Sequence, residues 1–323
     1  MTPPPAQLAV AETREIDADA GDFADALLIG LRSTPKRIAC KYFYDAEGSH
    51  LFEKICALPE YYPTRTELAL LNAHASEMAR FVGAGAEIME FGAGAGEKIR
   101  PLLDALVRPH AYVPIDISGS YLRNIAARLG ADYPALTIQP VAADFTGDVG
   151  WPASPGVRRV GFFPGSTIGN FETHEARAFL ARTAKLLQGG GLLIGVDLVK
   201  DPAVLHAAYN DRAGVTAAFN KNLLVRANRE AGANFELARF THYAFYNPLA
   251  RRIEMYLVST AAQRVSVCGR SFAFAEGEAV HTEYSYKYTV ENFRALASSA
   301  GFVPRAVWCD ENRLFSIHWL ESP

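Results

Sequence analysis

From residue 88 the chain reads Ile88-Met89-Glu90-Phe91-Gly92-Ala93-Gly94-Ala95-Gly96-Glu97-Lys98, and a second apolar run, Tyr112-Val113-Pro114-Ile115-Asp116, follows after a helix-length segment. This order of elements is typical of a nucleotide-binding βαβ unit: an apolar run, a glycine turn, a helix, and a second apolar run that ends in an acid. Because glycine has no Cβ, Gly92, Gly94 and Gly96 let the chain turn sharply and leave the helix N-terminus open to a ligand. Asp116 stands where a carboxylate can accept hydrogen bonds from a ribose diol. The pattern predicts a cofactor that contains a nucleoside.

A third apolar run, Val141-Ala142-Ala143-Asp144-Phe145, also ends in an acid, and here an aromatic residue follows. Asp144 could accept the exocyclic amine of adenine while Phe145 covers the base. The glycines are spaced G-x-G-x-G rather than G-x-G-x-x-G, although a glycine loop alone could be a tight turn in another α/β protein. Together these features resemble the class I S-adenosylmethionine-dependent methyltransferases. The resemblance implies S-adenosyl-L-methionine as methyl donor, leaving S-adenosyl-L-homocysteine.

Composition allows this interpretation and argues against several others. The chain has 323 residues, 50% of them hydrophobic, so it can form two domains or one domain with a large insertion. A net charge of -3 with dispersed basic residues argues against nucleic-acid binding. No apolar stretch is long enough to span a membrane, and no signal peptide is evident, so we expect a cytoplasmic protein without an obligate protein partner. The cysteines and histidines lack metal-ligand spacing, and we expect no metal.

Hydrophobic periodicity predicts an α/β fold with a Rossmann-like parallel sheet. Helices are expected at residues 64–81 and 173–187, and further strands at residues 160–163 and 192–197. The alternation of strands and helices then lapses: residues 203–224 are helical in pattern, and four successive strands follow. We expect a helix capped by Thr289 and two closing strands at the end.

These patterns predict the following division of the chain. Residues 63–196 and 287–323 form the S-adenosylmethionine-binding methyltransferase domain. Residues 23–62 and 197–286 form a second, α+β cap domain that binds substrate. Residues 1–22, which are rich in proline and polar residues at the start, are expected to be disordered.

Several strings narrow the resemblance. They are Lys41-Tyr42-Phe43-Tyr44-Asp45, Gly48-Ser49, Leu58-Pro59-Glu60-Tyr61-Tyr62-Pro63-Thr64-Arg65, Gly165-Ser166-Thr167-Ile168-Gly169-Asn170, Ile253-Glu254-Met255 and His281-Thr282-Glu283-Tyr284-Ser285-Tyr286-Lys287. From about Lys36 onward the chain resembles the histidine Nα-methyltransferases of ergothioneine biosynthesis. Such enzymes convert L-histidine stepwise to its trimethyl betaine, hercynine.

The resemblance implies a role for each of fifteen residues. The cofactor would be bound by Gly92, Gly94, Gly96, Lys98, Asp116, Asp144 and Phe145. The substrate would be bound by Tyr61, Gly165, Asn170, Tyr209, Met255, Glu283 and Ser285, with Glu283 and Ser285 at the imidazole. Tyr44 would lie near the amine as the catalytic residue, and its acceptance of a proton is a hypothesis.

Other interpretations remain open at this point. The tyrosines could be ordinary half-buried residues, Met255 a core residue and Glu283 a solvated charge on an edge strand. Lys98 could simply complete a helix start. The acceptor could be another amino acid, such as a tryptophan derivative, although a carboxylate at Glu283 suits an indole poorly. A nicotinamide-dependent oxidoreductase and a non-catalytic cofactor-binding protein are the alternatives from other classes.

Overall fold

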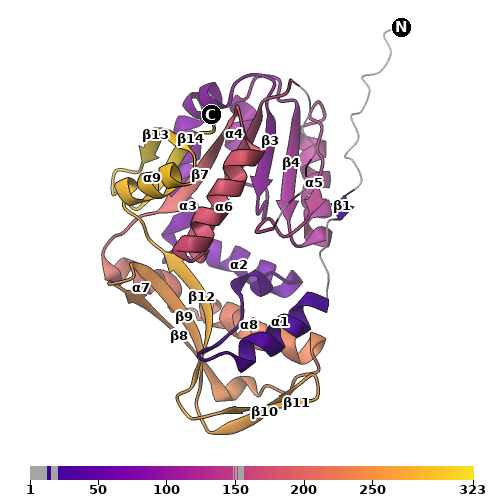
Figure 1. Cartoon of the computed structure of the whole chain (residues 1–323), viewed down its shortest axis with the longest axis vertical. Helices are drawn as coiled ribbons and strands as arrows, with labels where there is room; N and C mark the ends of the chain where they lie inside the picture. Colours follow the sequence, from indigo (N-terminus) through magenta and orange to yellow (C-terminus); the bar gives the residue numbers. More distant parts are fainter. Residues whose placement is uncertain (1–12, 16–20, 148, 150, 152–155) are drawn as a thin grey trace.

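The computed structural model describes residues 13–15, 21–147, 149, 151 and 156–323. It contains an eight-stranded sheet and a four-stranded sheet, both packed against helices, and one further two-stranded hairpin (Figure 1). Most of the N-terminal segment for which we expected disorder lies outside the described residues. Within that segment, Arg14–Glu15 form a short strand, β1.

The eight-stranded sheet has the order β1-β5-β4-β3-β6-β7-β14-β13. Six strands are parallel: β1, β3 (Glu87–Phe91), β4 (Ala111–Asp116), β5 (Val141–Ala142), β6 (Arg159–Phe163) and β7 (Gly191–Asp197). The closing strands β13 (Val303–Cys309) and β14 (Phe315–Glu321) run antiparallel to their neighbours. This is the Rossmann-like sheet expected from the sequence. The chain reverses its direction of winding between β3 and β6, so ligands are expected at the carboxyl ends of these strands.

Helices cover both faces of this sheet. One apolar core joins it to α3 (Tyr62–Val82), α4 (Arg100–Ala105) and α5 (Gly119–Asp132). The opposite core joins it to α6 (Thr173–Leu186) and α9 (Val290–Ser299). Thr289 caps α9 as expected, because its side-chain oxygen accepts a hydrogen bond from the Asn292 N–H. A short 3₁₀ helix, η2 (Thr167–Asn170), follows β6.

The four-stranded sheet has the order β2-β12-β9-β8. Its strands are β2 (Lys36–Arg37), β8 (Phe240–Asn247), β9 (Arg252–Ser259) and β12 (Ala279–Tyr286). Its apolar face forms a third core with α1 (Gly21–Arg32), η1 (Cys40–Phe43), α2 (Ala46–Cys56), α7 (Pro202–Tyr209) and α8 (Val215–Glu230). The hairpin of β10 (Gln263–Val267) and β11 (Arg270–Phe274) adds to this core.

Residues 203–224 are divided between two helices rather than forming the single one that their pattern suggested. The break falls after Tyr209, where Gly214 adopts a φ of +71° and the Asp211 carboxylate accepts hydrogen bonds from the Val215 and Thr216 N–H groups. Asp211 thus satisfies the free N–H groups at the start of α8. The first of the four expected strands, predicted from Glu236 to Tyr246, begins only at Phe240, because Leu237–Arg239 form a 3₁₀ helix, η3.

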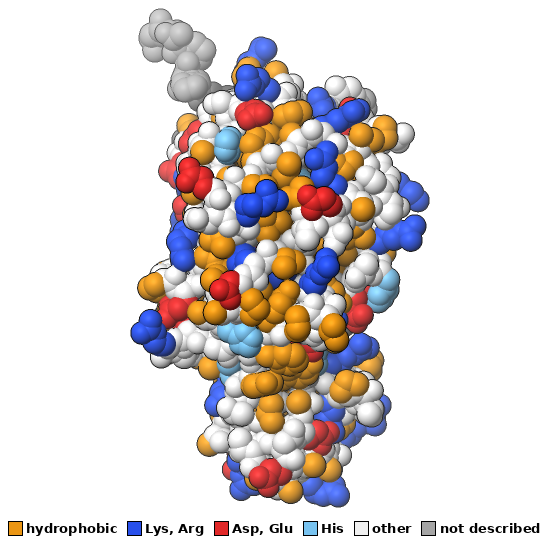
Figure 2. Space-filling model, turned by 90° about the vertical axis from the view of Figure 1, so that its left-hand side faces the viewer, with side chains coloured by type: hydrophobic (Ala, Val, Ile, Leu, Met, Phe, Trp, Pro, Cys, Tyr) orange, Lys and Arg blue, Asp and Glu red, His pale blue; other side chains and the backbone are white. Residues whose placement is uncertain are grey.

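The surface in Figure 2 carries interspersed basic and acidic side chains rather than a large area of one charge. Within the described part of the chain, no helix combines the length and apolar character needed to cross a bilayer.

Candidate active site

The glycine turn after β3 lies against the acid that ends β4. Gly92, Gly94 and Gly96 all have positive φ, at +73°, +48° and +71°. The Gly94 N–H donates to Asp116 Oδ2 at 3.2 Å, and the Ser118 N–H donates to Oδ1 at 3.0 Å. A Cβ on Gly94 would have no atom closer than 3.9 Å, so space remains above the turn for a ligand. The turn therefore fits the expected cofactor, with Asp116 held beside it.

Asp144 and Phe145 lie at the carboxyl end of β5. The Asp144 carboxylate accepts hydrogen bonds from the Thr146 N–H at 2.9 Å and from Lys41 Nζ at 3.1 Å. Burial acts to raise the pKa of Asp144, but these partners outweigh it and leave the pKa below its usual value. The Phe145 ring stands over the turn, 3.5 Å from where a Cβ on Gly92 would lie. The expected acid and aromatic ring thus accompany the glycine turn.

Lys98 and Gly165 are brought together by Glu67, a residue that the sequence analysis missed. Glu67 is fully buried in α3, and its carboxylate accepts from the Gly165 N–H at 2.9 Å and pairs with Lys98 Nζ at 2.8 Å. Burial acts to lower the pKa of Lys98, but Glu67 outweighs it and leaves that pKa raised. A Cβ on Gly195 would lie 2.0 Å from Glu67 Oε1, so glycine in β7 makes room for the carboxylate. Helical spacing puts Glu67 on the same apolar face as Leu71. A charged residue on an apolar helix face could therefore have pointed to Glu67 from the sequence.

The three predicted tyrosines belong to one aromatic group. The ring centroid of Phe52 lies 5.7 Å from that of Tyr44 and 6.2 Å from that of Tyr61, and the Tyr61 centroid lies 6.5 Å from that of Tyr209. Burial is the largest cause that raises the pKa of each of these tyrosines, and Glu283 raises it further. All three phenols are therefore protonated near neutral pH. Tyr44 can accept a hydrogen bond, but it is rarely a phenolate.

Glu283 and Ser285 are on the buried side of β12, opposite Met255 and Ile253 of β9. The register shifts between His281 and Glu283 because Thr282 forms a β-bulge. The hydroxyl of Thr282 donates to the Met255 carbonyl oxygen at 3.1 Å. Met255 is almost completely buried and is the cross-strand partner of Glu283.

The Glu283 side chain is only 8% exposed, yet its carboxylate makes no hydrogen bond with any residue that the structure describes. Burial raises the pKa of Glu283 to about 7, while the positive charge of Lys287 acts to lower it. A buried carboxylate without a partner is costly, and a ligand that donates a hydrogen bond would relieve this cost.

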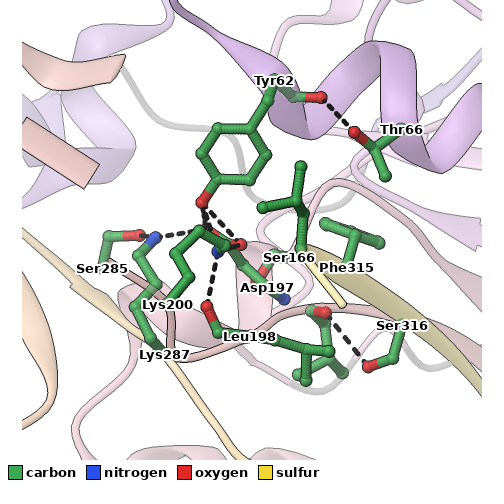
Figure 3. A network of polar contacts seen from close by, with 12 residues as sticks. Tyr62, Thr66, Ser166, Asp197, Leu198, Lys200, Ser285, Lys287, Phe315 and Ser316 are labelled. Atoms are coloured by element: carbon green, nitrogen blue, oxygen red, sulfur yellow. Dashed lines mark hydrogen bonds and ion pairs between the residues drawn. The ribbon is translucent and has the colours of Figure 1, made fainter. Parts of the chain in front are cut away.

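Lys287 and Asp197 form an ion pair between the two sheets (Figure 3), which the sequence analysis did not single out. Lys287 Nζ is 2.7 Å from Asp197 Oδ2, and both side chains are buried. Lys287 also donates to Ser285 Oγ at 2.7 Å, and the Tyr209 hydroxyl donates to the same oxygen at 2.7 Å. The sequence feature that could have pointed to this pair is the position of Lys287, a charged residue that directly follows a buried strand. Tyr209 and Ser285, which the resemblance placed at different parts of the substrate, are thus in direct contact.

Asn170 ends η2, which packs on β12. A Cβ on Gly169 would lie 2.7 Å from the Tyr286 carbonyl oxygen, so the loop after β6 approaches β12 closely. Asn170 is half-buried, and its side chain makes no hydrogen bond with another described residue. Its amide is therefore available to a ligand at the carboxyl end of β6. Among the residues described, no three His, Cys, Asp or Glu side chains are grouped as metal ligands.

Comparison with known proteins identifies the family. The model of the histidine-specific, S-adenosylmethionine-dependent methyltransferases matches residues 23–322. The chain belongs to this family. It is 43% identical over 287 residues to a histidine N-alpha-methyltransferase of Mycolicibacterium smegmatis, with 87% of this chain and 89% of that protein covered. The corresponding protein of Mycobacterium tuberculosis is 39% identical over 310 residues, with 94% and 96% covered.

A more distant relative is the ergothioneine biosynthesis protein 1 of Neurospora crassa, 29% identical over 307 residues. The match covers 88% of this chain and 33% of that longer protein. Family membership makes the chain an S-adenosylmethionine-dependent methyltransferase and disfavours the nicotinamide-dependent alternative.

Proposed function

We propose that this protein transfers three methyl groups in succession to the α-amino nitrogen of L-histidine, giving hercynine, the first step of ergothioneine biosynthesis. The observation that carries the proposal is the unpartnered, buried carboxylate of Glu283 next to the hydroxyl of Ser285. These two groups suit a side ring with two nitrogen atoms.

Imidazole meets this requirement better than indole does. Its two nitrogens can donate and accept when the ring is neutral, whereas indole has a single N–H. An indole could satisfy at most one of the two groups, and a buried polar group without a partner costs about 1–3 kcal/mol. Met255 lies directly across from Glu283 on the same face of the sheet and would leave less room for the larger ring. This argues against a tryptophan derivative as the acceptor.

The residues act mainly by holding the reactants in position. S-adenosylmethionine supplies a methyl group on a sulfonium ion, and the glycine turn with Asp116, Asp144, Phe145 and Lys98 would bind it. Tyr61, Asn170 and Tyr209 would bind the amino and carboxylate groups of histidine, so that its nitrogen is aligned for in-line attack. The tyrosine faces can also attract the permanent positive charge of the product.

The amine must lose a proton before each transfer. Tyr44 is the proposed first acceptor. Its raised pKa keeps the phenol protonated, so its oxygen would take the proton from the amine while its own hydroxyl hydrogen passes to water.

The proposal includes the division of the chain given above. Residues 23–62 and 197–286 would act as the substrate-binding cap, and the remainder from residue 63 as the methyltransferase domain. The glycine turn lies in the second unit and Glu283 in the first, so the reaction would take place where the two meet. We further propose that the protein works in the cytoplasm without an obligate protein partner, because its ligands are free small molecules.

The test is mass spectrometry of histidine incubated with the protein and S-adenosylmethionine, with tryptophan in a parallel reaction. We expect products with one, two and three added methyl groups from histidine only. Glu283→Ala should lose most of this activity. Glu278→Ala is the matched control, since Glu278 pairs with Lys36 outside the site and its loss should leave the activity intact. Full activity of Glu283→Ala, or equal methylation of tryptophan, would contradict the proposal.

A further inference from the structure

Lys287 directly follows β12, at the point where the two sheets meet (Figure 3). Its ammonium group contacts three acceptors: Asp197 Oδ2 at 2.7 Å, Ser285 Oγ at 2.7 Å and the Tyr209 hydroxyl oxygen at 3.2 Å. An ammonium group has three hydrogens and cannot accept a hydrogen bond. All three hydrogens are therefore used, and the direction of each of these contacts is fixed.

The charge on Lys287 is secured by Asp197. Burial acts to lower the pKa of Lys287, but Asp197 outweighs it and leaves this pKa well above its usual value. Asp197 in turn pairs with Lys200 and accepts a hydrogen bond from Tyr62 at 2.7 Å. Burial acts to raise the pKa of Asp197, but the two lysines outweigh it and lower this pKa. The pair thus stays charged, and Lys287 remains a donor to Ser285.

Counting the hydrogen bonds of Ser285 shows what it can offer a ligand. A hydroxyl oxygen has two lone pairs and one hydrogen. Lys287 donates to one lone pair of Ser285, and the Tyr209 hydroxyl donates to the other at 2.7 Å. Only the hydroxyl hydrogen is left. Ser285 can therefore donate to a ligand but cannot accept from one.

Glu283 offers a ligand an acceptor, whereas Ser285 offers a donor. It is two residues before Ser285 on the buried face of β12. A ring N–H beside it would favour its ionised form, in which the carboxylate is an acceptor only. A ring that matches both residues has one N–H for Glu283 and one bare nitrogen for Ser285. Neutral imidazole has this arrangement, whereas imidazolium carries N–H on both nitrogens.

Resting on the proposed function, we propose that Lys287 is a positioning residue that makes Ser285 a hydrogen-bond donor, so that the site selects the neutral imidazole ring of histidine over the imidazolium form. Lys287 does not touch the ligand in this proposal. It acts through Ser285 and Tyr209.

Proton release on binding tests this selection. Histidine is titrated into the protein saturated with S-adenosylhomocysteine, by calorimetry at pH 6 in buffers of different ionisation enthalpy. The titration is repeated with 2-fluorohistidine, whose ring is neutral at this pH. The α-ammonium group of the free amino acid lowers the ring pKa from the peptide value to near pH 6, so about half of free histidine is imidazolium at this pH. We therefore expect histidine to release about 0.5 proton more than 2-fluorohistidine does.

The titratable groups that interact with Glu283 or Lys287, directly or through Asp197, are common to both titrations. They are Glu283, Lys287, Asp197, Lys200, Tyr62, Tyr209, Tyr61, Tyr44 and Cys40. Their contributions cancel in the difference between the two ligands, as does that of the substrate amine.

Two variants and one matched control link the effect to Lys287. Lys287→Met frees a lone pair on Ser285, so the difference in proton release should fall well below that of the wild type. Ser285→Ala should lower the difference in proton release in the same way, and it leaves the ion pair of Lys287 and Asp197 in place. The double variant should lower the difference no further than either single variant does. Lys200→Met also removes a lysine bound to Asp197, but Lys200 contacts neither Ser285 nor Tyr209. This control should keep the wild-type difference.

The outcomes separate this inference from the proposed function. No difference between the two ligands, or proton uptake with histidine, would overturn the inference even if histidine is trimethylated, because it would mean that Ser285 accepts from the ring. The inference would also be overturned if the difference in proton release were unchanged in both Lys287→Met and Ser285→Ala. Failure of histidine to bind or to gain methyl groups would instead overturn the proposed function.

Discussion

Replacing Glu283 by glutamine should make the ligand-free protein more stable at neutral pH and should change how its stability depends on pH. Burial without a hydrogen-bond partner raises the pKa of Glu283 from 4.5 to about 7. In the folded protein the protonated form is favoured, so its contribution to stability is fully present below pH 4.5 and is lost as the pH rises through 7. A shift of this size corresponds to about 3 kcal/mol of unfolding free energy. Glutamine cannot ionise and avoids this loss.

Urea unfolding of the wild type and Glu283→Gln between pH 4.5 and 8, without ligands, measures this effect. The unfolding free energy of the variant minus that of the wild type should rise by about 3 kcal/mol across this range and level off above pH 7. The contributions of other titrating groups cancel when the two curves are subtracted. One such group is Glu90, because burial raises its pKa to about 8. Two curves that stay parallel across the range would refute the reasoning, because they would mean that Glu283 is solvated or paired in the folded protein.

Two further predictions concern other parts of the site. Gly195→Ala would place a Cβ 2.0 Å from the Glu67 carboxylate, so it should displace Glu67 from Lys98 and lower the unfolding free energy by about 1–3 kcal/mol in urea. The substitution should also weaken the binding of S-adenosylhomocysteine. An unchanged affinity for this ligand would mean that Glu67 does not contribute to cofactor binding. Tyr44→Phe should slow methyl transfer and alter its pH profile in steady-state assays, and an unchanged rate and profile would end the hypothesis that Tyr44 accepts the proton.

The central strands of the eight-stranded sheet were predictable because they are buried on both faces, whereas β1 lies in the segment expected to be disordered. Strands of this kind are largely apolar in the sequence, as at β3, β4 and β7, and each of these three ends in an acid or is followed by a glycine. The glycine turn and Asp116 were found for the same reason, since they directly follow these runs. Local pattern was sufficient wherever the site residues stand at strand ends.

Residues that act through distant partners were harder to find. Glu67 and Lys287 carry charge into the interior, and their partners Lys98, Gly165 and Asp197 are far away in sequence. Nothing local indicates which buried charge will meet which partner. The break in the helical pattern after Tyr209 is a different case, because Asp211 caps α8 through residues only four and five positions later in the sequence.

The side chain of Glu283 could not be oriented from alternation alone. Val280 is buried and pairs with Leu257, and strict alternation from Val280 would turn Glu283 toward the outer face. The bulge at Thr282 inserts one extra residue and brings Glu283 and Ser285 to the inner face. Single-residue bulges leave little trace in the sequence, so a solvated edge charge was an equally good interpretation of Glu283.

The same bulge separates the folding role of β12 from the recognition role that we propose for it. The segment before Thr282 is anchored to Leu257 and to β2, and the segment after it presents Glu283 and Ser285. Substitutions in the second segment can therefore retune the choice of acceptor while the anchor keeps its packing. A scaffold divided in this way can diversify toward new amino acids by exchanging a few side chains, without first evolving a new sheet.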